Sequence, residues 1–284
     1  MKKLSAVILL LLALIFLPFT TQTAFADAQS DIAKYTAAIK ADPNNASNYY
    51  YRGKAYSNLN DYKNAIADFT KAIELKPTSD GSYYGRGVAY YYLKDYNRAI
   101  EDYNKAISLN PKYEYAYNNR GNAYSALGQN ERAIQDYNKA IELNPQYEYP
   151  YNNLGVVYDE LEQYERAIQY YNKAIALNPQ YDKAYGNRGS DYFSLGKYQQ
   201  AIEDCNKAIQ LGNNLTKVYI ARGFSYFSLK DYKNALPDFN RILQDPEYAN
   251  DAIFYNYRGL CYMKLGDTQK AAADIAKAKQ LGHR

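Results

Sequence analysis

The chain has 284 residues, of which 36 are tyrosine, and its 34 basic and 30 acidic residues give a formal net charge of +4. This near balance argues against a nucleic-acid-binding groove, which needs a concentrated basic stripe. The only histidine is His283, next to the C-terminus, and the sequence shows no metal-ligand cluster, phosphate-binding loop or nucleophile–base pair. The composition therefore argues against an enzyme and predicts no cofactor.

The N-terminus has the pattern of a secretory signal peptide. Two lysines near the start precede an apolar run over residues 6–19, and residues 24–26, Ala-Phe-Ala, form a small-x-small cleavage signature. We predict a signal peptide over residues 1–26, cleaved after Ala26. The apolar run is short and contains Pro18, which disfavours a membrane span, and an uncleaved anchor is the alternative. The mature protein is thus predicted to be exported, periplasmic or extracellular, without a membrane span.

The rest of the chain has a period of 34 residues. A glycine recurs with this spacing, followed three residues later by a tyrosine and twelve residues later by an alanine. The glycines are Gly53, Gly87, Gly121, Gly155, Gly189 and Gly223, and Gly259 follows after 36 residues. A period of this length indicates a solenoid of helical hairpins, in which each unit buries its apolar face only against its neighbours.

The residues within one period carry a family resemblance. Residues 83–111 read Tyr-x3-Gly-x2-Tyr-x8-Ala-x3-Tyr-x2-Ala-x4-Pro, which resembles the tetratricopeptide repeat. The resemblance implies an all-α, right-handed superhelical solenoid of antiparallel helix hairpins, with about fifteen helices, and an activity of the binding class. The resemblance covers residues 46–284 in seven units, and positions within a unit are counted from its first residue. The units are 46–79, 80–113, 114–147, 148–181, 182–215, 216–251 and 252–284.

Residues 27–45 are predicted to form an N-terminal capping helix. Tyr35, Ala38 and Pro43 match the second half of a repeat, so this segment should be a lone second helix that covers the first full unit. At the other end, Lys279 replaces the isoleucine of earlier repeats, which suits a terminal helix with no neighbour beyond it.

Each full unit contains two amphipathic helices, called A and B. In the third unit, Tyr117, Gly121 and Tyr124 share one face of helix A at i, i+4 and i+7. The glycine should let helix A approach helix B closely. Aspartates at the start of helix B are expected to be N-caps, namely Asp61, Asp95, Asp231 and Asp267. Asn-Pro pairs should end helix B, because proline disfavours helix in the preceding residue.

Two charged positions repeat in register. Position 7 is arginine and position 23 is aspartate in six of the seven units, and only the fourth unit replaces both, with Leu154 and Tyr170. The pairs are Arg52–Asp68, Arg86–Asp102, Arg120–Asp136, Arg188–Asp204, Arg222–Asp238 and Arg258–Asp274. Because both residues change in the same unit, we expect each arginine to pair with the aspartate of its own unit. Two independent solvated charges are the alternative.

The two cysteines, Cys205 and Cys261, are separated by a whole repeat. This separation is too large for a disulfide bond. We predict two buried free thiols, and an intermolecular bridge is the alternative.

Members of the resembled family bind ligands on the concave surface, which helix A lines. Asn119, Asn153 and Asn187 occupy position 6 of three consecutive units. A carboxamide offers both a donor and an acceptor, which suits a peptide main chain, and asparagine ladders hold extended peptides in some family members. A hydrated polar face is the alternative.

A second resemblance is to family members that clamp a C-terminal carboxylate with lysine, arginine and asparagine. Asn122, Asn153 and Lys183 match that pattern, whereas Asn118 and Asn187 stand where the family has cations. The match is therefore three positions of five.

Aromatic residues also occupy groove positions, where they can form apolar pockets or stack on prolines or sugar rings. They are Tyr50, Tyr84, Tyr91, Tyr115, Tyr149, Phe193, Phe224 and Phe227. At helical spacing, the alternative is that they belong to the core.

The sequence thus predicts a non-enzymatic protein-interaction scaffold that binds an extended peptide segment outside the cytoplasm. The alternative is an envelope-assembly or glycan-binding factor that uses the aromatic groove. No catalytic or metal-binding residue is predicted. The candidate peptide-binding residues are Asn118, Asn119, Asn122, Asn152, Asn153, Lys183, Asn187, Tyr84, Tyr91, Tyr115 and Tyr149.

Overall fold

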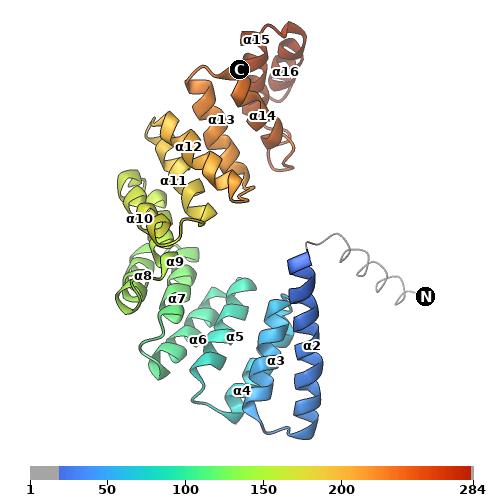
Figure 1. Ribbon diagram of the computed structural model, residues 1–284, viewed down its shortest axis with the longest axis vertical. Helices are drawn as coiled ribbons and strands as arrows, with labels where there is room; N and C mark the ends of the chain where they lie inside the picture. The colour runs from blue at the N-terminus through green and yellow to red at the C-terminus, as the bar shows by residue number, and fades with distance from the viewer. Residues whose placement is uncertain (1–18, 283–284) are drawn as a thin grey trace, which may run out of the picture. The chain divides into compact units, whose positions relative to one another are not determined.

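The computed structural model describes residues 19–282, which form helices joined by short turns (Figure 1). These residues contain fifteen helices and no strand, so the all-α prediction is confirmed. Much of the predicted signal peptide, residues 1–18, lies outside the described part. Among the helices of the described part, none has the length and apolar character that a membrane crossing requires.

The helices form two compact units that divide between Leu143 and Asn144. The N-terminal unit contains α2 (Phe19–Ala41), α3 (Ala46–Asn58), α4 (Tyr62–Leu75), α5 (Asp80–Tyr92), α6 (Tyr96–Leu109), α7 (Glu114–Ala126) and α8 (Asn130–Leu143). The C-terminal unit contains α9 (Glu148–Glu160), α10 (Tyr164–Leu177), α11 (Asp182–Ser194), α12 (Tyr198–Gln210), α13 (Thr216–Ser228), α14 (Tyr232–Ile242), α15 (Ala252–Lys264) and α16 (Thr268–Gln280). Odd-numbered helices from α3 onward are the A helices, and even-numbered helices from α4 onward are the B helices.

The first helix, α2, is a single helix that packs against α3. It begins at Phe19, earlier than the predicted capping helix over residues 27–45, and the predicted cleavage point after Ala26 lies inside it. No glycine or proline interrupts the sequence of α2, and the helix ends shortly before Pro43, because the residue preceding a proline disfavours helical geometry.

The predicted aspartate N-caps are confirmed at all four positions. In the first repeat, the side chain of Asp61 accepts a hydrogen bond from the backbone N–H of Asn64, at 3.2 Å. The same contact begins α6, α14 and α16. Each cap satisfies a backbone donor that the helix cannot satisfy itself, and so fixes where helix B starts.

The glycine at position 8 sets how closely helix A approaches helix B. A Cβ atom at Gly121 would lie 2.7 Å from the ring of Tyr137, and one at Gly87 would lie 2.8 Å from the ring of Tyr103. Both rings are buried, with small alanines beside them. Alternating large and small side chains therefore pack the hairpin core tightly.

The six predicted arginine–aspartate pairs are confirmed. In each, Nε and Nη2 of the arginine donate to the two carboxylate oxygens at 2.6–3.0 Å, in a bidentate arrangement. The carboxylates are buried, and this burial raises the pKa of Asp136 although Arg120 opposes the rise. The charge-assisted bonds therefore act against the desolvation cost of burying the carboxylate.

Each of these arginines also reaches the preceding repeat. Its Nη1 donates to a threonine or asparagine on the preceding even-numbered helix, and its guanidinium lies 5.4–5.8 Å from the ring of the tyrosine at position 4. The acceptors are Thr36, Thr70, Asn104, Asn172, Asn206 and Asn240. We call this group of arginine, aspartate, tyrosine and threonine or asparagine the arginine clamp. It joins helix A to its own helix B and to the helix before it.

The fourth repeat has two uncharged residues, Leu154 and Tyr170, in place of the ion pair. Leu154 is fully buried. Tyr170 stacks on Tyr158, with ring centroids 5.3 Å apart and planes 9° apart. The repeat therefore replaces both members of the ion pair together and leaves neither charge buried alone.

The cysteine prediction is also confirmed, since Cys205 and Cys261 are free and buried. Burial raises the pKa of each thiol to about 12, so both remain protonated at neutral pH. Protonated buried thiols are unreactive.

The clamp predicts that replacing one member of an ion pair destabilises the protein more than replacing both members together. Asp136→Ala should cost about 3–5 kcal/mol of unfolding free energy, because it leaves the charge of Arg120 buried without its counterion. The double variant Arg120→Leu, Asp136→Tyr copies the fourth repeat and should stay close to the parent in stability. Urea unfolding followed by circular dichroism measures both. A double variant as unstable as the single one would show that the pair is not the reason for the covariation.

Candidate functional site

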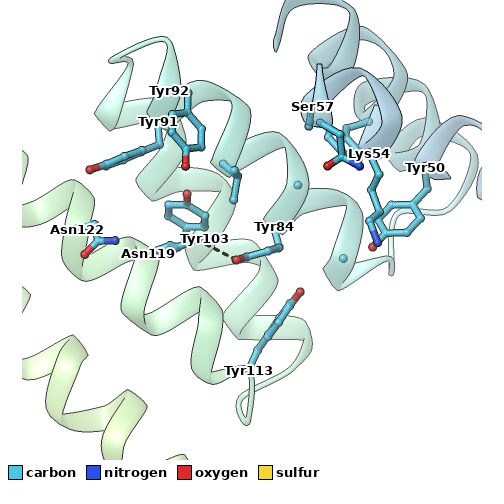
Figure 2. Close-up of a pocket in the computed structure, with 15 residues that line it drawn as sticks. Tyr50, Lys54, Ser57, Tyr84, Tyr91, Tyr92, Tyr103, Tyr113, Asn119 and Asn122 are labelled. Atoms are coloured by element: carbon cyan, nitrogen blue, oxygen red, sulfur yellow. Dashed lines mark hydrogen bonds between the residues drawn. The ribbon is translucent and has the colours of Figure 1, made fainter. Parts of the chain in front are cut away.

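A cavity of about 460 Å³ opens in the N-terminal unit on the A helices of three successive repeats (Figure 2). Helices α3, α5 and α7 supply most of its wall. The lining residues are Tyr50, Lys54, Ser57, Asn58, Phe69, Gly81, Tyr84, Gly85, Val88, Tyr91, Tyr92, Tyr103, Tyr113, Asn119 and Asn122. The volume is within the range of small-ligand sites, about 300–1,000 Å³.

Two glycines lie in the cavity wall. Gly81 and Gly85 occupy positions 2 and 6 of the second repeat, where the third repeat carries Tyr115 and Asn119. A Cβ atom at Gly85 would lie 2.6 Å from the ring of Phe69, so this ring packs directly on the backbone of α5. The second repeat therefore places no side chain at either position.

One hydrogen bond orients a donor into the cavity. Asn119 Nδ2 donates to Tyr84 Oη at 2.9 Å, as the dashed line in Figure 2 marks. A hydroxyl that accepts this bond keeps its own proton for a different acceptor. Burial raises the pKa of Tyr84 to about 12, so the hydroxyl remains protonated at neutral pH. The arrangement therefore presents an O–H donor to a ligand.

The cavity wall is aromatic and carries one charge. The ring of Tyr84 lies 4.8 Å from that of Tyr113, measured between centroids, and Tyr91 lies 5.8 Å from Tyr92. Among the fifteen lining residues only Lys54 is charged, and its ammonium group lies 5.8 Å from the ring centroid of Tyr50. The site thus combines flat apolar surfaces with hydroxyl, amide and ammonium donors.

Four of the candidate residues of the N-terminal unit meet at this cavity, namely Tyr84, Tyr91, Asn119 and Asn122. The other two do not line it. Tyr115 is exposed and packs edge-on against Tyr113, with centroids 6.2 Å apart. Asn118 is buried and donates to Asn119 Oδ1 at 3.1 Å, so it positions the amide of Asn119.

In the C-terminal unit, the asparagines form an internal chain of hydrogen bonds. Asn187 Nδ2 donates to Asn152 Oδ1 at 3.2 Å, and Asn187 Oδ1 accepts from Lys217 Nζ at 2.7 Å. Asn152 in turn donates to Asn153 at 3.4 Å. Asn187 is only 7% exposed, so the protein itself uses its carboxamide.

The remaining candidates of that unit are on the surface. Lys183 and Tyr149 are exposed, and Asn153 is half-buried. The ring of Tyr149 lies 5.3 Å from that of Tyr181, centroid to centroid.

The C-terminal unit has an aromatic cavity of its own, about 420 Å³ in volume. Its walls are Phe193, Tyr198, Phe224, Phe227, Ser228, Lys230, Tyr232 and Tyr257. Three of these are groove aromatics named from the sequence. Phe227 and Phe224 meet the ring of Tyr257 edge-on, at 4.9 and 4.8 Å between centroids, so several rings of this cavity also pack against each other.

Sequence reasoning missed a buried acid, Asp191 on α11. It is 0% exposed, and neither of its carboxylate oxygens meets a hydrogen-bond donor. Burial first, and then the neighbouring charge of Asp159, raise the pKa of Asp191 to about 8. The acid therefore holds a proton at neutral pH, which it can share with Asp159. Burial also lowers the pKa of Lys217, although the two acids oppose this.

The signal for Asp191 was present in the repeat. It occupies position 10, where the first three repeats carry the alanines Ala55, Ala89 and Ala123. A comparison of this position across units would have identified it. Over the described residues 19–282, no group of three or more histidine, cysteine or carboxylate side chains could hold a metal ion.

Comparison with known families matches nearly the whole repeat region. The tetratricopeptide repeat matches residues 46–79, 82–113, 149–181 and 182–214, and related descriptions of the same repeat match residues 102–135, 121–162 and 220–282. The chain belongs to the tetratricopeptide repeat family.

Solved structures with the same fold include three that illustrate its range. The crystal structure of MamA is 28% identical, with a TM-score of 0.51, over 58% of this chain and 96% of MamA. Pseudomonas aeruginosa pilF is 19% identical, with a TM-score of 0.66, over 78% of this chain and 96% of pilF. YrrB, described as a TPR protein with an unusual peptide-binding site, is 23% identical, with a TM-score of 0.51, over 66% of this chain and 97% of YrrB. No curated protein matches the chain.

The position of Asp191 predicts a pH effect. Its folded-state pKa lies above the unfolded value of about 4, so the folded chain holds a proton that the unfolded chain releases. The titration of Asp191 should therefore lower the free energy of unfolding as pH rises from about 4 towards about 8, the folded-state pKa.

Asp191→Ala should remove that slope, because it removes the titrating group. Asp191→Asn is the matched control, because it removes the titration but keeps a polar group. Urea unfolding at several pH values tests this. Parallel pH profiles for the parent and Asp191→Ala would mean that Asp191 does not titrate as expected.

Proposed function

We propose that this protein is a non-enzymatic scaffold that binds an extended peptide segment on its A helices, outside the cytoplasm. The observation that carries the proposal is the cavity of the N-terminal unit, where Asn119 orients the hydroxyl of Tyr84 as a donor. A peptide in extended conformation presents carbonyl acceptors along its length, and its side chains need apolar pockets. The cavity offers both.

Membership of the tetratricopeptide repeat family supports the binding class of this function. YrrB is a TPR protein with an unusual peptide-binding site, so a protein with this fold can bind peptides. The location outside the cytoplasm rests on the sequence alone, namely the lysines, the apolar run and the Ala-Phe-Ala tripeptide within residues 1–26.

One observation favours a glycan as the second candidate ligand. Tyr92 is 59% exposed and stacks on Tyr62, with centroids 5.0 Å apart and planes 8° apart. A flat, exposed aromatic pair of this kind can stack on a sugar ring as well as on an apolar side chain. An envelope-assembly factor with this ligand would use the same cavity.

Amide substitutions test the peptide proposal. A peptide selected from a display library on the purified protein should bind Asn119→Ala more weakly, by about 2- to 10-fold. The variant loses the bond that orients the Tyr84 hydroxyl towards the peptide, and one such hydrogen bond is worth about 0.5–1.5 kcal/mol. Calorimetric titration gives the affinities.

Asn138→Ala is the matched control for this variant, because Asn138 is an exposed asparagine on a B helix. Parent affinity in Asn119→Ala, with parent-like melting, would show that this amide has no part in peptide binding. Asn187→Ala should act differently and lower stability, because Asn187 bonds to Asn152 and Lys217.

The proposed location has its own test. Expressed in a secretion-competent bacterial host, the protein should appear outside the cytoplasm with Asp27 as its first residue, as N-terminal sequencing would show. Ala26→Lys should block cleavage, because the processing site needs a small residue. A cytoplasmic chain that starts at Met1 would contradict export, and an exported chain that starts at Met1 would identify an uncleaved anchor.

A further inference from the structure

We infer that the cavity of the N-terminal unit selects a proline-containing segment with an acidic residue next to the proline. This inference rests on the proposed function, since it specifies which extended peptide the groove takes. It follows from the shape, the hydrogen-bond donors and the charge of the cavity wall.

The walls suit a rigid ring. Tyr84, Tyr91, Tyr92 and Tyr113 line one space (Figure 2). Val88 adds an aliphatic side chain to the same wall. Aromatic-lined grooves accept proline-rich segments because the polyproline II conformation is already formed before binding and loses little entropy. Proline also has no N–H, so its burial in an apolar pocket leaves no backbone donor unsatisfied.

The polar groups of the cavity suit a ligand rich in acceptors. Polyproline II segments form no internal hydrogen bonds, so their carbonyl groups need external donors. Tyr84 supplies an oriented O–H, because Asn119 already donates to its oxygen. The ammonium group of Lys54 adds a charged donor from α3, on the opposite side of the cavity from Asn119 in Figure 2.

The positive charge in the cavity wall favours an acidic residue next to the proline of the peptide. Lys54 is exposed and is the one charged residue among the fifteen that line the space. Asp80 is close enough for its charge to affect Tyr50 and Tyr113, but it does not line the cavity, and its oxygens accept from Gly81 N at 2.9 Å and from Asn110 Nδ2 at 3.0 Å. An acidic ligand residue in the cavity would therefore find Lys54 as its partner, whereas a basic one would find no carboxylate among the lining residues.

The glycines give a way to close the cavity without removing its polar groups. Gly81 is the second residue of α5, and a Cβ atom there would meet only the end of the Tyr50 side chain, at 3.3 Å. The third and fourth repeats carry Tyr115 and Tyr149 at this position. Gly81→Tyr therefore copies a residue that the fold already accepts there. It should add a ring at the cavity wall, because Gly81 lines the cavity, and it should stabilise α5, because glycine is a poor helix former.

The experiment starts with a display library of random peptides selected on the purified protein. We expect enrichment of proline next to aspartate or glutamate. A consensus peptide is then titrated beside its Pro→Ala and Glu→Lys versions and a neutral chito-oligosaccharide, with tyrosine fluorescence as the signal, since the protein contains no tryptophan. Each peptide change should weaken binding by about fivefold or more, the size of one lost ring or charge contact.

Protein variants locate the effect. Gly81→Tyr should abolish binding of the consensus peptide while it raises the melting temperature, and Lys54→Glu should reverse the preference to basic peptides. Lys63→Glu, an exposed lysine on α4, is the charge control and should change neither property.

The outcomes separate this inference from the proposed function. Selected peptides without proline or acidic residues, or binding unaffected by Gly81→Tyr, would overturn the inference and leave a peptide scaffold in place. A chain that binds the oligosaccharide but no peptide would overturn both.

Discussion

The arginine clamp is the interaction on which the rest of the structure depends. Each guanidinium is mostly buried and uses Nε and Nη2 for the aspartate of its own repeat and Nη1 for the helix before it. A charge taken out of water is tolerable only when its partners are complete and well aligned. The clamp therefore demands one relative placement of three helices, and that demand recurs along the array.

The clamps also hold the helices that form the cavity of the N-terminal unit in fixed positions. Its walls are helices α3, α5 and α7, and each of the three carries a clamp, through Arg52, Arg86 and Arg120. The clamps fix the A helices, so Tyr84 and Asn119 can hold their geometry before a ligand arrives. A site arranged in advance loses less entropy on binding than one that must form around its ligand.

How much the sequence could predict depended on whether a feature repeats. The fold followed from the glycine period, and the ion pairs followed from the joint change to Leu154 and Tyr170. The acceptor on the preceding helix repeats equally well, for example at Thr70 and Asn104, yet it was missed because its partner lies in a different repeat.

The site was harder to predict because it depends on departures from the repeat. Asn119 and Asn187 share one position, but the first lines a cavity while the second is held by Asn152 and Lys217. Those partners recur as well, because Asn118 shares the repeat position of Asn152 and Lys183 shares that of Lys217, so the pattern alone does not show in which unit such a bond forms. The packing at Gly85 likewise depends on where the ring of Phe69 lies, and a one-dimensional pattern does not contain that information.

The reach of the clamp into the preceding repeat also bears on how such an array can change in length. Every helix from α2 to α14 that precedes an arginine-bearing repeat offers threonine or asparagine at the same place, so duplication or loss of a whole 34-residue unit would leave each arginine with an acceptor. At α16 that place holds Ala276, which has no side-chain acceptor. A copied unit would thus be accommodated inside the array, whereas one stacked on α16 would bury an arginine whose Nη1 lacks this partner.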